Sequence, residues 1–291
     1  FLLGNVEDYL FIEKIFKDNL IDIVFHAAAY KHVPLLEMNP LQGIKNNVFS
    51  TLSICKAAEN LNLKKVTLIS TDKAVRPSNV MGASKRLSEL IFQAYANKFK
   101  LQENNFTKYC IVRFGNVLNS SGSVVPLFKK QIASGGPITL THEKVIRYFM
   151  TVPEAAQLVI QATTLCEGGE VFLLDMGAPI KIYDLAKQMI RLSGLTIKDD
   201  LNPDGDIEIV TSGLRPGEKL YEELLIDAES KQTLHPLIFK ANEAFIPYEV
   251  LNKNLNELRV KITKQELNHV IEIVKKLVPE WRSDSLKNYY S

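Results

Sequence analysis

Residues 70–85 read Ser-Thr-Asp-Lys-Ala-Val-Arg-Pro-Ser-Asn-Val-Met-Gly-Ala-Ser-Lys, and this stretch decides the fold of the chain. The apolar run 65–69 before it is typical of a buried parallel strand. After it, apolar residues recur at helical spacing and predict an amphipathic helix over 84–100: Leu87, Leu90, Ile91, Ala94 and Tyr95. Ligands of open α/β sheets bind beyond the carboxyl ends of the strands. The stretch should therefore bring a carboxylate, amines and hydroxyls to a site.

The alternation of strands and helices continues on both sides of this stretch. Strands are predicted at 21–25 and 109–114, and helices at 9–17, at 41–61 and from about residue 126. This order predicts an α/β fold, a Rossmann-like doubly wound parallel sheet. The Gly-x-Gly-x-x-Gly fingerprint of such folds is absent, and residues 1–5 read as the end of a buried strand. We therefore expect a chain that begins inside a fold, without its first βαβ unit.

The pattern loosens after Gly135. Shorter elements are predicted there, namely strands at 138–140, 170–174 and 206–210, the last an edge strand, and helices at 153–165 and 182–193. We expect three regions. These are a partial dinucleotide-binding domain with the catalytic residues (1–135), a mainly substrate-binding lobe (136–260) and a tail of unassigned role (261–291).

Composition excludes several classes of function. The 35 Lys and Arg residues against 33 Asp and Glu residues give a net charge of +2, which argues against a nucleic-acid surface. No apolar run approaches the roughly 20 residues that cross a bilayer, so we expect no membrane contact from this segment. Cys55, Cys110 and Cys166 lie in apolar contexts and are expected to be buried free thiols, which suits a reducing, cytoplasmic compartment. No metal site is predicted.

Met81 and Lys85 are four residues apart and should share one helix face. The pattern resembles the Tyr-x-x-x-Lys element of the extended short-chain dehydrogenase/reductase superfamily, with methionine in place of the tyrosine base. One branch resembles the chain with that substitution included: the long, membrane-anchored dehydratases that act on UDP-N-acetylglucosamine in bacterial polysaccharide biosynthesis. The resemblance is carried by residues 26–34, 70–85, 113–118, 147–150 and 214–220.

The resemblance implies a 4,6-dehydration that uses NAD, with NADP possible. Asp72 would take the proton from the carbon 4 hydroxyl and later protonate the carbon 6 hydroxyl, since a thioether is no base. Lys73 would take the carbon 5 proton as a neutral amine, helped by the Lys85 cation, and Lys85 would also bind the nicotinamide ribose. Thr71 would meet the sugar and Met81 would line its pocket. The alternative from the residues alone is that Asp72 caps a turn and Lys73 is solvated.

The resemblance also implies binding residues and an oligomer. Cofactor contacts would come from Asn5, Val6, Ala27, Ala28, Lys31, Ser70 and Lys85. The UDP-sugar would be held by Asn116, Ser121, Ser123, Arg147, Arg215 and Glu218, with the two arginines on the diphosphate and the glutamate on the uridine ribose. His26 reads more as a structural histidine than a catalytic one. A homo-oligomer, a dimer in the family, is expected.

Two other functions stay open. A UDP-sugar 4-epimerase would share the sheet and both arginines, but Met81 counts against it because that reaction relies on the tyrosine. A catalytically inactive nucleotide-sugar binding module would bind UDP-sugar without turnover.

Overall fold

A computed structural model describes residues 1–99, 107–120, 122–223, 230–282 and 286. The chain divides into two compact units, which we treat separately. Unit 1 comprises Phe1–Phe114, Gln157–Asp175 and Glu223–Ser291, and unit 2 comprises Gly115–Ala156 and Met176–Glu222. The chain therefore passes between the units several times, whereas the sequence suggested three consecutive regions.

Unit 1 is built on a six-stranded sheet with the order β1-β2-β3-β8-β13-β12. The first four strands pair in parallel: β1 (Ile23–His26), β2 (Lys65–Ile69), β3 (Lys108–Arg113) and β8 (Val171–Leu174). Antiparallel strands β13 (Ile238–Ala241) and β12 (Ser230–Gln232) extend the far edge. The predicted parallel α/β sheet is thus confirmed, with an antiparallel addition.

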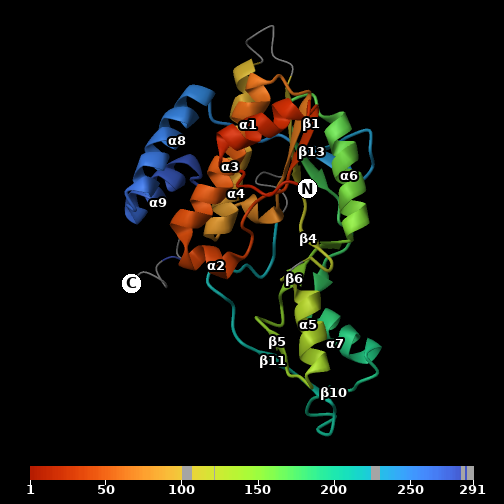
Figure 1. The fold of residues 1–291 in the computed structure, drawn as a ribbon. Coiled ribbons are helices and arrows are strands. Elements are labelled where there is room, and N and C mark those ends of the chain that lie inside the picture. The colour runs from red at the N-terminus through yellow and green to blue at the C-terminus, as the bar shows by residue number, and fades with distance from the viewer. Residues whose placement is uncertain (100–106, 121, 224–229, 283–285, 287–291) are drawn as a thin grey trace. The chain divides into compact units, whose positions relative to one another are not determined.

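Helices cover both faces of this sheet (Figure 1). One face carries α1 (Tyr9–Asp18), α3 (Pro40–Asn60) and α4 (Val80–Phe99), with the short α2 (Val33–Met38) nearby. On the other face lies α6 (Val152–Leu165), where the Thr163 and Thr67 hydroxyls are 2.9 Å apart. A single-turn 3-10 helix, η1 (Asp72–Ala74), separates β2 from α4.

Helix α4 is buried on nearly every side, so its predicted amphipathic character is wrong. The five predicted apolar positions are buried, and so are the polar side chains of Ser84, Lys85, Arg86, Ser88 and Glu89. The cover comes from α8 (Tyr248–Thr263) and α9 (Leu267–Leu277), which pack on α4 and α3. Much of the tail of unassigned role therefore belongs to the core of unit 1, and Trp281 and Leu286 are buried in that same core.

Residues 1–5 form no strand, which corrects the expectation of a buried strand end. Phe1, Leu2 and Leu3 are exposed, and β1 is the terminal strand of the sheet, so no described strand pairs with this segment. An apolar sequence becomes a buried strand only where a neighbouring strand and a covering layer are available.

Unit 2 contains a parallel sheet of β10 (Ile197–Lys198), β11 (Ile207–Thr211) and β5 (Ile138–Leu140). Strand β11 lies in its middle, so the predicted edge position of this strand is wrong. Helices α5 (Val124–Ala133) and α7 (Ile182–Leu192) pack with the sheet around Phe128, Ile190 and Ile207. Two small ladders complete the unit, with β4 (Asn116–Val117) on β7 (Phe149–Met150) and β6 (Ile146–Arg147) on β9 (Ile180–Lys181).

The three cysteines are buried free thiols, as predicted. Within the described ranges, no helix is both long enough and apolar enough to cross a membrane.

Candidate active site

The end of β2 leads into a short turn, residues 70–74, that carries three of the predicted catalytic side chains, Thr71, Asp72 and Lys73. Backbone hydrogen bonds hold it beside β3, from Ser70 N to Val112 O (2.8 Å) and from Asp72 N to Phe114 O (3.1 Å). Thr71 caps η1 because its hydroxyl accepts from the backbone N–H of Lys73 at 3.4 Å. The cap is therefore Thr71, and the Asp72 side chain is left for other contacts. We call residues 70–74 the catalytic turn because the predicted catalytic residues Thr71, Asp72 and Lys73 lie in it.

The carboxylate of Asp72 is almost completely buried, with 1% of the residue exposed. Its Oδ1 accepts from the Thr71 hydroxyl at 2.8 Å and from Lys73 Nζ at 2.9 Å. Its Oδ2 is buried without a hydrogen-bond partner among the described residues. A buried carboxylate oxygen that lacks a donor is unfavourable unless a ligand supplies one. Oδ2 is therefore the carboxylate oxygen that is left over for an acid–base role.

Lys73 is ion-paired rather than solvated, since 20% of its side chain is exposed and its ammonium contacts Asp72. The alternative in which Asp72 caps a turn and Lys73 is solvated does not describe this geometry.

Lys85 is buried beside the end of β2, and its Nζ donates to the carbonyl oxygen of Ile69 at 2.7 Å. Burial lowers the pKa of Lys85 to about 8, and the negative charge of Glu89 partly opposes that shift. The lysine therefore still carries its charge at neutral pH. Its predicted action on Lys73 stays a prediction.

Met81 lies one turn before Lys85 on α4 and is 5% exposed. The next residue, Gly82, is a positioning residue that sequence reasoning missed. A Cβ atom at Gly82 would lie 2.2 Å from the carbonyl oxygen of Lys73, so only glycine lets the helix approach the catalytic turn this closely. The start of α4 is anchored by Asn79 and Glu37, whose side-chain oxygens accept from Gly82 N (2.8 Å) and Val80 N (2.6 Å).

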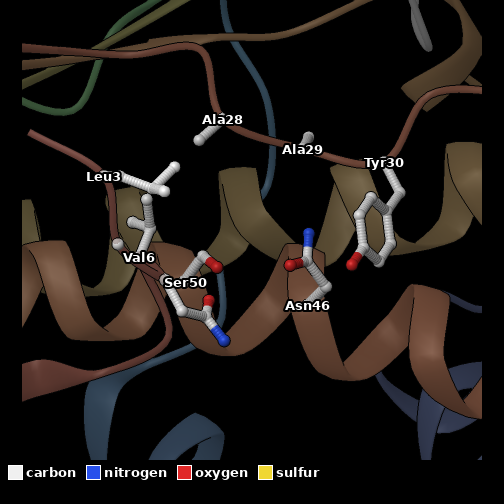
Figure 2. A pocket seen from close by; sticks show the side chains of 9 residues that line it. Leu3, Val6, Ala28, Ala29, Tyr30, Asn46 and Ser50 are labelled. Atoms are coloured by element: carbon white, nitrogen blue, oxygen red, sulfur yellow. The ribbon is translucent and has the colours of Figure 1, made fainter.

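A cavity of about 390 Å³ lies in unit 1 and contains several of the predicted cofactor residues (Figure 2). It is lined by Leu3, Gly4, Asn5, Val6, Ala28, Ala29, Tyr30, Asn46 and Ser50. The small side chains and few polar groups suit part of a dinucleotide, such as a nucleoside. Asn5, Val6 and Ala28 are thus brought together, whereas Ala27 and Lys31 are exposed and do not line the cavity.

Asn46 and Ser50 were missed by sequence reasoning. Both side chains extend from α3 toward the backbone of residues 28–30 (Figure 2). Their spacing of four residues on one helix face was the available signal. The adjacent Asn47 connects α3 to the backbone that lines the other side of the cavity. Its amide oxygen accepts from Tyr30 N (2.7 Å), and its amide nitrogen donates to Tyr30 O (3.0 Å) and to the Ser84 hydroxyl (2.9 Å).

His26 is buried at the end of β1, with Nε2 3.1 Å from the Thr51 hydroxyl. Burial, with a smaller effect of the Lys85 cation, lowers the pKa of His26 to about 3. The imidazole is therefore neutral at physiological pH, in keeping with a structural role.

Ser70, predicted to contact the cofactor, turns its hydroxyl inward. It donates to Glu89 Oε1 at 2.6 Å, and Glu89 in turn pairs with Arg113. The serine thus belongs to a buried ionic cluster in this structure.

The predicted substrate residues belong to unit 2. The guanidinium of Arg147 makes its contacts within that unit. It donates to the carbonyls of Lys219 (2.8 Å) and Leu220 (3.1 Å), and it lies 3.5 Å from Glu218 Oε1. Glu218 also accepts from the Thr141 hydroxyl at 2.8 Å and from the backbone N–H of Arg215 at 3.2 Å. The structure therefore brings the side chains of Arg147 and Glu218 together, with the backbone of Arg215 beside Glu218, while their contacts with a diphosphate or ribose stay predictions.

The remaining predicted substrate residues are less informative. Asn116 is in β4 and donates its backbone N–H to Tyr148 O at 3.1 Å. Ser123 precedes α5, and its hydroxyl is buried without a partner among the described residues. Ser121 lies outside the described residues.

The parallel sheet with helices on both faces defines a Rossmann-like α/β protein. The family model described as "Polysaccharide biosynthesis protein" matches residues 1–243. The chain belongs to this family.

Two curated relatives of the chain are informative. The chain is 54% identical over 213 residues to the capsular polysaccharide biosynthesis protein CapD of Staphylococcus aureus, an alignment that covers 73% of the chain and 33% of CapD. It is 35% identical over 229 residues to a UDP-glucose 4-epimerase of Rickettsia rickettsii, with 79% of the chain and 62% of that protein covered. The chain thus spans about a third of the length of CapD, and also of the Bacillus subtilis relative EpsC.

Solved structures agree with the fold. The structure of Pen from Bacillus thuringiensis superposes with a TM-score of 0.72 at 33% identity, covering 88% of this chain and 81% of that one. DesIV of Streptomyces venezuelae, a dTDP-glucose 4,6-dehydratase with NAD bound, superposes with a TM-score of 0.64, covering 76% of this chain and 69% of that one. At 19% identity, the likeness to DesIV concerns the fold alone.

Proposed function

We propose that the protein to which this chain belongs is a lyase that dehydrates UDP-N-acetylglucosamine to a UDP-4-keto-6-deoxy-N-acetylhexosamine. The observation that carries the proposal is the Asp72 carboxylate, buried in the turn with Oδ2 unpartnered and held by Thr71 and Lys73. Met81 stands where related reductases have a tyrosine base, so an acid–base group elsewhere is needed, and Asp72 supplies one.

Asp72 and Lys73 of the turn each carry out two of the proton transfers. Asp72 accepts the proton of the carbon 4 hydroxyl as that carbon is oxidised to a ketone. Lys73, acting as a neutral amine after releasing its own proton, then removes the proton at carbon 5, which the ketone has acidified. Asp72 returns its proton to the carbon 6 hydroxyl, which leaves as water. Finally, Lys73 returns a proton to carbon 5 when carbon 6 is reduced, so the sugar has lost one molecule of water.

A nicotinamide cofactor would accept the hydride from carbon 4 and return it to carbon 6. The cavity of Figure 2 suits its nucleoside portion because Ala28 and Ala29 leave space and Asn5, Asn46 and Ser50 offer polar groups. Lys85 would donate to the ribose on the nicotinamide side, as its charge at neutral pH allows. We propose NAD, with NADP as the alternative, on the resemblance of residues 70–85 to the reductase superfamily. A homo-oligomer stays part of the proposal.

Mass spectrometry tests the proposal. The protein, as its complete gene encodes it, is incubated with UDP-N-acetylglucosamine and NAD⁺, with Asp72→Asn and Lys73→Ala in parallel. We expect a product lighter by one water, and a rate reduced by about 10²-fold or more in both variants. Arg282→Ala, which changes an exposed side chain, is the control and should leave the rate unchanged.

The second candidate is a UDP-sugar 4-epimerase, favoured by the 35% identity to the Rickettsia enzyme. It predicts a product of unchanged mass and inverted configuration at carbon 4. Tight UDP-sugar binding without any product would instead support an inactive binding module.

A further inference from the structure

A cluster of buried charged side chains joins α4 to the strand ends that precede the catalytic site. Glu89 is fully buried, and its Oε1 accepts from the Ser70 hydroxyl (2.6 Å) and from Arg113 Nε (2.7 Å). Its Oε2 accepts from Arg113 Nη2 (2.5 Å) and from Arg86 Nη1 (3.0 Å). Glu89 therefore ties the helix both to the first residue of the catalytic turn and to the end of β3.

Residues far along the chain complete this cluster. The carboxylate of Glu243 accepts from both Arg113 and Arg86, the latter at 2.8 Å, and its side chain is 4% exposed. Glu280 Oε1 accepts from Arg86 Nε at 3.1 Å. Each guanidinium is thereby paired with more than one carboxylate, and this pairing offsets part of the cost of burying its charge.

The residues that follow Glu280 reach the segment between the catalytic turn and α4. The backbone N–H of Arg282 donates to the carbonyl oxygen of Pro77 at 2.9 Å, and Trp281 is 4% exposed. Pro77 lies in the loop 75–79, whose Arg76 adopts a left-handed backbone (φ 41°) and pairs through its side chain with Glu223. A non-glycine residue in this conformation needs support from its surroundings.

We infer that Glu280, Trp281 and Arg282 form a latch that positions the catalytic turn. The latch contacts the loop 75–79 at Pro77 and the first part of α4 at Arg86. Met81 and Lys85 lie between these two contacts, so the segment that carries them is held at both ends. The matched family region ends at residue 243, so these three residues lie beyond it. The inference rests on the proposed function only in calling the turn catalytic.

Two pairs of variants separate the latch from general stability. Arg282→Pro removes the N–H that Pro77 accepts, whereas the control Arg282→Ala keeps it. Glu280→Gln keeps an acceptor oxygen but loses the charge opposite Arg86. Its control is Glu272→Gln, an exposed glutamate on α9. Glu280→Gln also serves as the milder variant if Arg282→Pro does not fold.

Hydrogen exchange of the amides in residues 73–82 is the direct readout. We expect exchange there to become roughly tenfold faster in Arg282→Pro and severalfold faster in Glu280→Gln, with the amides of β3 unchanged. Both controls should behave like the parent protein. Unchanged exchange in residues 73–82, or an equal acceleration throughout unit 1, would overturn the latch.

Activity provides the second readout. Because small displacements of catalytic groups are costly, we expect kcat to fall about threefold to tenfold in both latch variants while KM stays the same. A rise in KM at constant kcat would contradict positioning. If the parent protein does not dehydrate the sugar but the exchange result holds, the proposed function fails and the latch remains. If dehydration occurs and exchange is unaltered, the latch alone fails.

Discussion

The predicted catalytic residues of unit 1 and the predicted substrate residues of unit 2 are held in different ways. Asp72, Lys85 and Glu89 are buried, and their partners come from the catalytic turn, the ends of β2 and β3, and α4. Arg147 is also buried but donates mainly to backbone carbonyls, and Glu218, whose side chain is 22% exposed, accepts from the Thr141 hydroxyl and the backbone N–H of Arg215. Acid–base chemistry depends on fixed positions, so dense packing suits unit 1. A region that binds a flexible ligand tolerates more freedom.

Breaking the charged cluster of unit 1 should have the largest effect. Arg113→Met leaves Glu89 and Glu243 buried without their main counter-ion, so we expect unit 1 to lose about 3–5 kcal/mol of unfolding free energy in urea titrations. The control is Lys14→Met, whose ion pair with Asp18 is mostly exposed and should matter little. A loss in Arg113→Met as small as in the control would show that the cluster is not a major stabilising feature.

The buried ammonium of Lys85 should be visible in the pH dependence of stability. Its pKa is about 8 in the folded protein and near the ordinary lysine value when unfolded. Below pH 8 both states hold the proton, and between about pH 8 and 10.5 the unfolded state binds more protons. The free energy of unfolding therefore rises with pH in that window, by up to about 3 kcal/mol from this group.

Lys85→Met removes this contribution, so the difference in unfolding free energy between the parent and the variant should grow from pH 8 to pH 10. Lys14→Met, an exposed lysine, should show a constant difference. A constant difference for Lys85→Met as well would mean that the lysine keeps its ordinary pKa when folded.

Gly82→Ala tests how closely α4 must approach the catalytic turn. The added Cβ meets the backbone carbonyl of Lys73, which cannot move without the turn, so we expect kcat to fall by about 10²-fold. In Gly43→Ala the Cβ would lie 2.9 Å from Leu36 Cγ, a side-chain atom that can shift. Steady-state rates should therefore be nearly unchanged in Gly43→Ala, and equal rates in the two variants would contradict this reasoning.

The smallest effect is expected in unit 2. Glu218→Gln should change the free energy of unfolding by less than about 1 kcal/mol, because the carboxylate is partly solvated. Binding of UDP, measured by calorimetry, should weaken severalfold if Glu218 holds the ribose. Glu208→Gln, an exposed glutamate on β11, is the control and should leave both quantities unchanged. Unaltered UDP binding in Glu218→Gln would remove this residue from the substrate site.

Local patterns predicted much of unit 1. Hydrophobic spacing located α4, and the apolar run before Ser70 located β2. The buried polar side of α4 could not be predicted, because Glu89 finds its partners in Arg113 and, through Arg86, in Glu243 and Glu280. Such partners are distant in sequence, so no local periodicity records them.

In the candidate active site, too, local sequence patterns could not show contacts between residues that are distant in sequence. Thr71, Asp72, Lys73 and Lys85 could be named because one motif contains them. The requirement for Gly82 arises from a tertiary approach to Lys73, and a glycine near the start of a helix gives only a weak signal of it. In unit 2, pairing on both sides of β11 overrode an alternating pattern that is typical of edge strands.

The central claim is most directly tested with UDP-N-acetylglucosamine that carries deuterium at carbon 4. Dehydration through Asp72 and Lys73 predicts a product lighter by one water that keeps the deuterium, now at carbon 6, and exchanges the carbon 5 hydrogen with solvent. A product of unchanged mass with deuterium still at carbon 4 would contradict the claim and favour an epimerase.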